Sequence, residues 1–281
     1  MTNLSMTAYF LSLLLLWTNF LQSPKGIEEI PVVACSNVIE NQWKGKRVAF
    51  LGDSITDKRR VGTNKCYWEY LAEMLGFTPF VYAVNGHRMD NIQGQAERLL
   101  EERGDDIDAI IIFAGTNDYN GGLPLGNWYE ETNAEVLVSG PKKEMRKHRK
   151  LIMDEKTFTS SINRVMNFLK TNYPDKQVIL LTPLHRAQAY FGDQNIQPEE
   201  SYANKIGNYI DDYVDVLKQT SNIWAVPVID LNSVSGLYPL NDAHIRYFNN
   251  GQTDRLHPNE LGHYRIAITL KYQLLALPAS I

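Results

Sequence analysis

The sequence has few cysteines and no excess of positive charge. The only cysteines among its 281 residues are Cys35 and Cys66. Two cysteines are too few for a disulfide scaffold or a Cys-rich metal site. They leave open either one disulfide or two unpaired thiols. The chain has 28 Lys and Arg residues and 32 Asp and Glu residues, so the formal net charge is -4. This balance does not indicate a nucleic-acid or anionic-membrane partner.

The chain also lacks a long membrane-spanning run, although its N-terminal region is apolar. Residues Tyr9–Leu21 are apolar except for three, and no Lys or Arg precedes them. A spanning helix needs about 20 mostly apolar residues, so this run resembles the apolar part of a secretory signal peptide more than an anchor. We expect residues 1–25 to be a signal segment and the protein to be secreted or periplasmic. Lipid attachment at Cys35 is a less favoured alternative, because charged residues separate it from the apolar run.

After Lys46, short apolar runs alternate with segments of helical periodicity. The expected strands are Arg47–Leu51, Phe80–Val84, Ala109–Phe113, Val178–Thr182 and Ile223–Ile229. The expected helices are Tyr67–Leu75, Asn91–Glu102, Phe158–Thr171, Tyr202–Thr220 and Pro258–Leu275. This alternation predicts an α/β fold, a three-layer α/β/α sandwich around a central, mostly parallel five-stranded sheet. One domain over residues 45–278 accounts for it, and its ligand site is expected at the carboxyl ends of the strands.

A long connection separates the third strand from the next helix. Residues 120–157 contain several glycines and two adjacent aromatic residues, Trp128 and Tyr129, and loops of this length are often functional. The same connection carries a basic cluster at 142–150, which we interpret as a solvated face rather than an anion-binding site.

Two short motifs place nucleophilic chemistry near the strand ends. Gly52-Asp53-Ser54 follows the first strand, but a serine hydroxyl needs an adjacent base and donors for an oxyanion before it can react. Asp254 precedes His257 by three residues, a spacing that in a turn lets a carboxylate reach the imidazole Nδ1. The other ring nitrogen is then free to accept a proton from serine, as in a Ser-His-Asp triad.

Two further motifs supply candidate hydrogen-bond donors. Gly86 follows the second strand, and Gly115-Thr116-Asn117-Asp118 follows the third. A glycine lets a substrate carbonyl approach a backbone N–H, and an Asn side chain offers an amide donor. Together with the N–H of Ser54, they form a plausible oxyanion hole.

In order and spacing, these four blocks resemble those of the SGNH/GDSL hydrolases, the GDSL-like lipase/acylhydrolases. The resemblance spans residues 45–275 and implies a flavodoxin-like SGNH fold. It further implies that Ser54 is the nucleophile, that His257 and Asp254 are its base and orienting acid, and that Ser54, Gly86 and Asn117 hold the oxyanion. One departure is Val81, where family members often carry an Asn five residues before the second-block glycine. An α/β-hydrolase is disfavoured, because the chain contains no Gly-x-Ser-x-Gly motif.

Other polar and aromatic side chains are weaker candidates for substrate binding. They are Asp53, His87, Asp118, Trp128, Tyr129, His185 and Arg186. Asp53 and Asp118 are more typical of carboxylates that support a loop, and core packing competes with stacking on a sugar for Trp128 and Tyr129. His263 lies six residues after His257 and is interpreted as structural.

The resulting prediction is a serine esterase that removes a short acyl group, most plausibly acetyl, from an ester on a carbohydrate. Alternatives are acyl transfer to a sugar hydroxyl and a lysophospholipase, thioesterase or arylesterase activity. An inert glycan-binding module is disfavoured because all the catalytic blocks are present. No cofactor and no metal are expected, since no His-x-Glu-x-x-His or similar ligand spacing occurs. The expected partner is a small-molecule or glycan ester, with no nucleic acid and no stable membrane span.

Overall fold

A parallel β-sheet forms the centre of the molecule. The structure is a computed structural model that describes residues 41–280, which belong to one compact unit. Its sheet contains β1 (Arg47–Gly52), β2 (Thr78–Val81), β3 (Ala109–Phe113), β6 (Gln177–Leu181) and β9 (Val228–Ile229). All pair in parallel, in the order β2-β1-β3-β6-β9. This is the strand order of the flavodoxin-like doubly wound fold, so the predicted fold class is confirmed.

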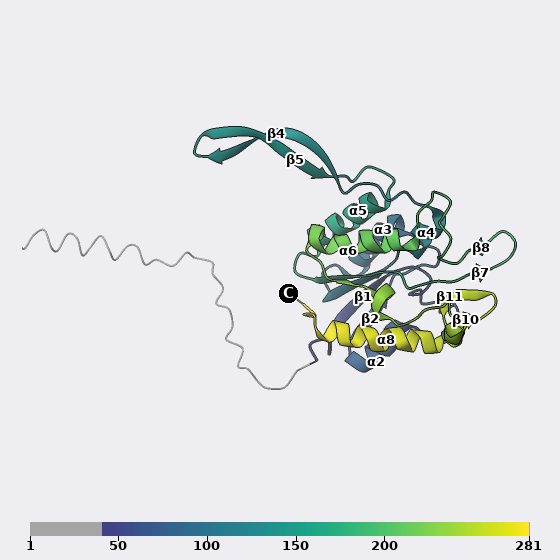
Figure 1. Cartoon of the computed structure of the whole chain (residues 1–281). Helices are drawn as coiled ribbons and strands as arrows, with labels where there is room; N and C mark the ends of the chain where they lie inside the picture. The colour runs from purple at the N-terminus through teal and green to yellow at the C-terminus, as the bar shows by residue number, and fades with distance from the viewer. Residues whose placement is uncertain (1–40, 281) are drawn as a thin grey trace, which may run out of the picture. The chain divides into compact units, whose positions relative to one another are not determined.

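Helices cover both faces of this sheet (Figure 1). One face packs on α2 (Tyr67–Leu75) and α8 (Glu260–Leu275), and the other on α3 (Met89–Arg103), α5 (Phe158–Asn172) and α6 (Ile210–Trp224). Each face encloses its own hydrophobic core, because successive side chains of a strand point to opposite sides. In β3, for example, Ile110 joins the core beneath α3, α5 and α6, whereas Ile111 joins the core beneath α2 and α8.

Two predicted boundaries on the C-terminal side of the sheet are wrong. Ile223 and Trp224 continue α6 instead of starting a strand, because Ala225 with φ of 51° ends the helix and leaves only Val228–Ile229 in the sheet. The helix also starts later than predicted, at Ile210, because residues 202–209 form a loop around Asn204. The Asn204 side chain donates to the Tyr119 carbonyl and accepts the N–H of Asn208. Smaller shifts affect β2 and β6, which begin and end earlier than the predicted strands.

A second, small sheet lies at the edge where the central strands end. It consists of β10 (Phe248–Asn250), β11 (Asp254–Pro258), β7 (Ala189–Tyr190) and β8 (Ile196–Gln197), all antiparallel. Pro258 therefore ends β11 and does not open the last helix as predicted; Asn259 caps α8 through N–H bonds from Leu261 and Gly262. Short helices α4 (Thr116–Gly121), α7 (Leu231–Val234) and the 3-10 helix η2 (Asp242–Tyr247) complete the connections.

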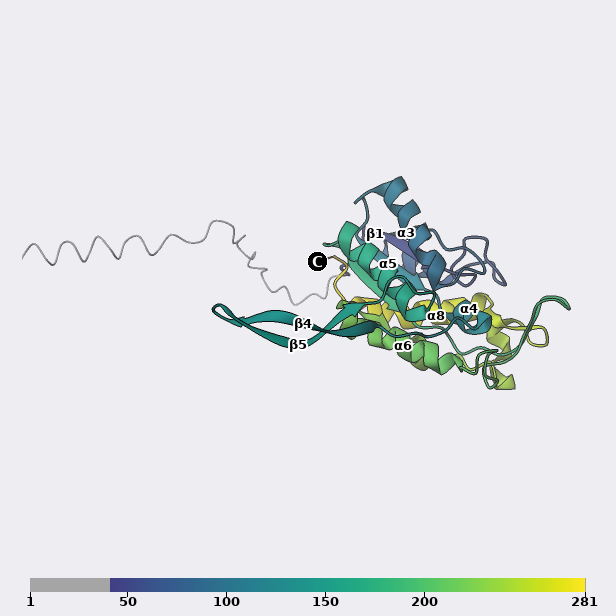
Figure 2. The ribbon, with the colours of Figure 1, turned by 90° about the horizontal axis from the view of Figure 1, so that it is seen from above.

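The long connection predicted as a loop contains a β-hairpin. Its strands are β4 (Tyr129–Ser139) and β5 (Lys142–Leu151), and the basic cluster forms most of β5. Cross-strand ion pairs hold the two strands together: Lys143 Nζ lies 2.9 Å from Glu135, and Lys147 Nζ lies 3.6 Å from Glu131. Figure 2 shows the hairpin projecting away from the helices. The sequence prediction missed it because its strands alternate mainly between charged and polar residues, without a buried face.

Within residues 41–280, no helix is both long and apolar enough to cross a membrane. The predicted signal segment, residues 1–25, and the lipid-attachment alternative at Cys35 lie outside the described residues.

Candidate active site

Three loops that leave the central sheet converge at one edge. Ser54 follows β1, Gly86 lies beyond β2, and Asn117 follows β3 at the start of α4. The Val84 N–H donates to the Gly52 carbonyl at 3.1 Å, which places the second loop beside the first. Gly52 also needs to be glycine, because a Cβ there would lie 2.3 Å from the carbonyl oxygen of Phe113. Close backbone packing thus brings the first three predicted motifs together.

Ser54, His257 and Asp254 form a connected series of hydrogen bonds. Ser54 Oγ lies 2.9 Å from His257 Nε2, and His257 Nδ1 lies 3.0 and 3.2 Å from the two Asp254 oxygens. All three side chains are buried, with 3 to 5% of their surface exposed. The arrangement can move a proton from a hydroxyl to an imidazole and stabilise the imidazolium with a carboxylate.

The contact between Asp254 and His257 is local, but it arises from a strand and not from the predicted turn. Both residues belong to β11, and Asp254 Oδ1 accepts the backbone N–H groups of Leu256 and His257. The carboxylate therefore bends toward the following residues, which allows a spacing of three even in an extended segment. Pairing of Asp254 with Ala189 of β7 fixes this strand on the molecule.

The sequence analysis missed Asn249 as a partner of this carboxylate. Asn249 Nδ2 donates to Asp254 Oδ2 at 2.9 Å from the neighbouring strand β10. Burial alone would raise the pKa of Asp254, but the hydrogen bond and charge of His257, together with Asn249, hold it below its ordinary value. The Asp254 carboxylate is thus kept ionised. No sequence motif points to Asn249, since its role depends on the pairing of β10 with β11.

The loops of Gly86 and Asn117 are joined by hydrogen bonds. The Asn117 amide donates to the carbonyl oxygen of His87 at 3.0 Å, and the Asn85 N–H donates to Asp57 at 2.7 Å. Gly86 has φ of 81°, a left-handed conformation that disfavours other residues, and no atom lies near the position of a Cβ. The loop therefore presents an exposed backbone beside Ser54's strand, as a binding site for an oxyanion requires.

Gln95 and Asp57 are further residues that the sequence analysis missed. Gln95 of α3 is buried, and its amide both accepts the Gly52 N–H and donates to the Gly52 carbonyl, each at 2.8 Å. Its Nε2 also lies 3.0 Å from Nδ1 of His87, which is half-buried. One side chain thus fixes both the end of β1 and the loop of Gly86, and Asp57 also holds that loop by accepting the Asn85 N–H.

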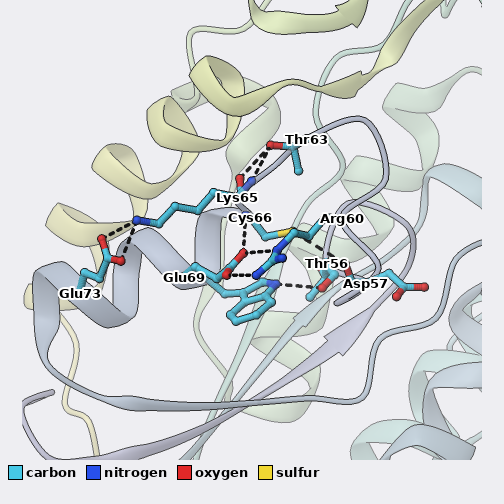
Figure 3. Close-up of polar contacts among 9 residues, drawn as sticks. Thr56, Asp57, Arg60, Thr63, Lys65, Cys66, Glu69 and Glu73 are labelled. Carbon is cyan, nitrogen blue, oxygen red and sulfur yellow. Dashed lines mark hydrogen bonds and ion pairs between the residues drawn. The ribbon is translucent and has the colours of Figure 1, made fainter.

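Polar contacts also hold the segment that follows Ser54 (Figure 3). Arg60 forms a two-point contact with Glu69, and the Trp68 indole donates to the carbonyl oxygen of Thr56. Cys66 is buried with its thiol 3.8 Å from the Asp57 carbonyl oxygen, and burial raises its pKa to about 12. Its role here is packing. The predicted alternative of a disulfide with Cys35 involves a residue outside the described part of the chain.

Two acidic residues among the weaker candidates support loops. Asp53 accepts the N–H of Ile55, and Asp118 accepts the N–H of Met89 at 3.0 and 3.1 Å, at the start of α3. Both are almost fully buried, and burial raises the pKa of Asp53 to about 6 and that of Asp118 to about 7. These contacts agree with the interpretation of both residues as loop supports.

His185 and Arg186 have different positions despite being neighbours. His185 is partly exposed and lies 2.6 Å from Glu200, which raises the pKa of the imidazole. Arg186 is 1% exposed and donates to Thr116 and Gln197, so it is a buried link between loops and not an exposed substrate-binding residue. Both line a cavity of about 10 Å³ next to Asp53, with room for about one water molecule.

Trp128 and Tyr129 are not brought to this edge. The Trp128 indole donates to Gln219 of α6, and Tyr129 begins β4 under the guanidinium of Arg149. The structure places other aromatic rings here instead. Phe191 lies 5.5 Å from the His257 ring, and Tyr238 lies 5.2 Å from the His185 ring; both are more than 40% exposed. No periodic pattern indicates these two rings in the sequence, because both lie in irregular loops.

His263 is separate from the reacting groups, as predicted. It is fully buried, its Nδ1 accepts the N–H of Tyr67, and burial lowers its pKa to about 3. The residue therefore stays neutral and fixes α2 to α8. Among residues 41–280, no group of three or more His, Cys, Asp and Glu side chains is arranged to bind a metal ion.

The chain is similar to a known protein family and to several solved structures. The model of the GDSL-like Lipase/Acylhydrolase family matches residues 50–265. A solved protein from Lactobacillus plantarum is 23% identical with a TM-score of 0.65, covering 83% of this chain and 98% of its own. A possible lipase from Chitinophaga pinensis is 20% identical, with a TM-score of 0.59 and coverage of 83% and 99%. A variant acetyl xylan esterase from Geobacillus stearothermophilus is 18% identical, with a TM-score of 0.51 and coverage of 84% and 97%. No curated protein matches in sequence.

Proposed function

Because the chain belongs to the GDSL-like lipase/acylhydrolase family and is an ester-hydrolysing enzyme, we propose that Ser54, His257 and Asp254 are its catalytic triad. The observation that carries the proposal is the 2.9 Å distance between Ser54 Oγ and His257 Nε2, with His257 Nδ1 bonded to Asp254. This contact joins residues 203 positions apart, which neither local structure nor chain proximity requires.

In the proposed reaction, His257 removes the proton of Ser54 as the hydroxyl oxygen attacks the ester carbonyl. The carbonyl oxygen becomes an anion, which the N–H groups of Ser54 and Gly86 and the amide of Asn117 stabilise. His257 then protonates the departing alcohol and leaves an acyl group on Ser54. A water molecule, deprotonated by His257, releases the acid and restores the serine.

The proposed substrate is an ester of a short acyl group, most plausibly acetyl, on a carbohydrate. Two features of the site support it. Ser54 is only 5% exposed, which leaves little room around its hydroxyl group for a bulky acyl chain. The exposed rings of Phe191 and Tyr238 can stack on the apolar face of a sugar. A structural neighbour is an acetyl xylan esterase, and a glycan ester is the corresponding proposal here.

The proposal also includes export from the cytoplasm, which rests on the apolar run Tyr9–Leu21. If residues 1–25 are a signal segment, N-terminal sequencing of the protein secreted by its producing cells will begin after them. Recovery of the intact N-terminus only from the cytoplasm would contradict export without affecting the catalytic proposal.

The first test is hydrolysis of p-nitrophenyl acetate, butyrate and octanoate. We expect the wild type to have its highest kcat/KM on acetate, and Ser54→Ala and His257→Ala to show only background activity. Asn117→Ala removes one oxyanion donor and should lose about 10²- to 10³-fold in kcat. Ser139→Ala, at the exposed end of β4, is the matched control and should equal the wild type. Full activity of Ser54→Ala would contradict the mechanism, and a preference for octanoate would contradict the short acyl group. Adding an acceptor sugar and looking for acylated product distinguishes transfer from hydrolysis.

A further inference from the structure

The hairpin of β4 and β5, residues 129–151, projects from the molecule as an arm (Figure 2). Only its base is fixed: the Ile152 N–H donates to the Trp128 carbonyl, and Asn163 of α5 donates to the carbonyl oxygens of both. Beyond the base, most of its side chains are exposed. A two-stranded hairpin is marginally stable in water by itself, and its open edges are ready to pair or pack. The exposed strands of the arm can therefore pair with or pack on another surface.

Apolar side chains gather near the tip of the arm. Leu137 is 62% exposed, Met145 is 65% exposed and Val136 is 43% exposed. From the register, Leu137 and Met145 lie on one face and Val136 on the other. Large apolar side chains exposed together mark an interaction site. The flanking residues are basic, since the arm carries six Lys or Arg and four Glu, a net charge of +2 in a chain of net charge -4.

A surface of complementary character spans β8, the loop that follows it and the start of α6. We define the loop patch as residues 196–212, which expose four large side chains: Ile196 (60%), Tyr202 (64%), Ile206 (44%) and Tyr209 (47%). The same residues carry Glu199, Asp211 and Asp212 against a single Lys205, while Glu200 is nearly buried against His185. The patch thus combines apolar groups with an excess of acidic side chains, opposite in sign to the net charge of the arm.

The loop patch is held in place without a partner. The Tyr119 hydroxyl donates to the Tyr202 carbonyl at 2.6 Å, and Asn204 donates to the Tyr119 carbonyl at 2.9 Å. Asp212 accepts the N–H of Tyr209 at the start of α6. A surface with a fixed backbone can bind a partner at little cost in conformational entropy.

The arm and the loop patch of one chain cannot meet. The tip points away from the end of the molecule that carries β7 and β8 in Figure 1, and away from α4 in Figure 2. We propose that the arm of one copy packs on the loop patch of a second copy, and that the exchange is reciprocal. Two copies related by a two-fold axis then form a closed dimer with two identical contacts. Opposite charges favour this pairing over a contact between two arms. If two arms paired along their β5 edges, two basic strands would lie side by side and repel each other.

Sedimentation velocity of the full chain tests the proposal. We expect a dimer for the wild type at tens of micromolar and a shift to monomer for the arm variant Leu137→Asp/Met145→Asp. The loop variant Tyr202→Asp/Ile206→Asp should become monomeric as well, because it removes the other half of the contact. Tyr272→Asp, a 63% exposed position on α8, is the control and should remain dimeric. Hydrolysis of p-nitrophenyl acetate and circular dichroism verify that each variant is folded.

Mixing the two variants gives a specific result. The arm variant retains an intact loop patch and the loop variant retains an intact arm, so a mixture restores one of two contacts and should form a heterodimer. A wild-type monomer would overturn the proposal, as would a loop variant that remains dimeric, which would indicate arm-to-arm contact. A wild-type monomer that co-sediments with vesicles of phosphatidylcholine and phosphatidylserine would instead assign the arm to a lipid surface.

Discussion

At the scale of single residues, the site depends on side chains that orient the proposed catalytic groups. Asn249 and the backbone of Leu256 and His257 all donate to the Asp254 carboxylate, while Gln95 clamps Gly52 just before Ser54. Each of these contacts is with a charged or backbone group in a buried position, where a lost hydrogen bond costs more than on the surface. The proposed triad is therefore part of a larger hydrogen-bond network.

Asn249→Leu tests this network, because leucine keeps the size of the side chain and removes the donor to Asp254. We expect kcat/KM to fall about 10- to 100-fold, since hydrogen bonds to charged groups contribute about 1.5–3 kcal/mol. The activity should also fall further at low pH than at neutral pH, because the pKa of Asp254 rises when a donor is lost.

Asn64→Leu is the control for this change, since Asn64 is exposed in the same groove as Asn249. A reduced rate with an unmoved pH profile would assign Asn249 to packing alone.

At the scale of elements, the proposed catalytic groups and the arm belong to different parts of the fold. The central strands and the small sheet of β7, β8, β10 and β11 place the reacting groups at one edge, whereas the arm projects from the connection between α4 and α5. The arm contributes no residue to either hydrophobic core, although Trp128 at its base packs against one of them. Its removal should leave the catalytic edge intact.

Joining Glu130 to Lys150 through an Asn-Gly turn tests this independence. The two residues face each other in the hairpin register, so a two-residue turn can close the shortened hairpin. We expect unchanged kcat/KM on p-nitrophenyl acetate, because the base contacts of Trp128 and Ile152 remain. A large loss of activity in a folded protein would show that the arm acts on the site of its own chain.

At the scale of the whole molecule, folding buries carboxyl groups whose ionised form is more stable in water. Asp118 is fully buried, and its pKa is raised from 3.8 to about 7 by burial. The folded state then binds the proton more tightly than the unfolded chain. The stability that this group contributes is present below about pH 4 and is lost as the pH rises through 7.

Asp118→Asn should remove this pH dependence. The amide oxygen can still accept the Met89 N–H, but the side chain no longer titrates. Between pH 4 and pH 8 we expect the free energy of unfolding, measured with urea, to fall less in the variant than in the wild type. The difference in the free energy of unfolding between the two proteins can change by at most about 1.4 kcal/mol per pH unit, over the pH range between the unfolded and folded pKa values of Asp118. The exposed Asp105→Asn serves as control, and parallel curves for Asp118→Asn and wild type would contradict the prediction.

The sequence alone determined the parallel sheet and the positions of Ser54, Gly86, Asn117, Asp254 and His257 relative to its strands. Strands buried on both faces are continuous apolar runs, and β3 was predicted to the residue for that reason. Glycine and the paired Asp and His are likewise local signals, because their function depends on backbone freedom or on a short spacing.

Tertiary structure alone decided which distant groups meet. Asn249, Gln95 and Phe191 reach the site through strand pairing and loop packing, and no periodicity or motif encodes those contacts. The arm was not predicted either, because its charged strands have no buried face and so produce no apolar pattern. The burial of Arg186 was also not predictable, since it results from the loops packed around it. Local sequence reports local preference, whereas contacts across the fold depend on the packing of the whole chain.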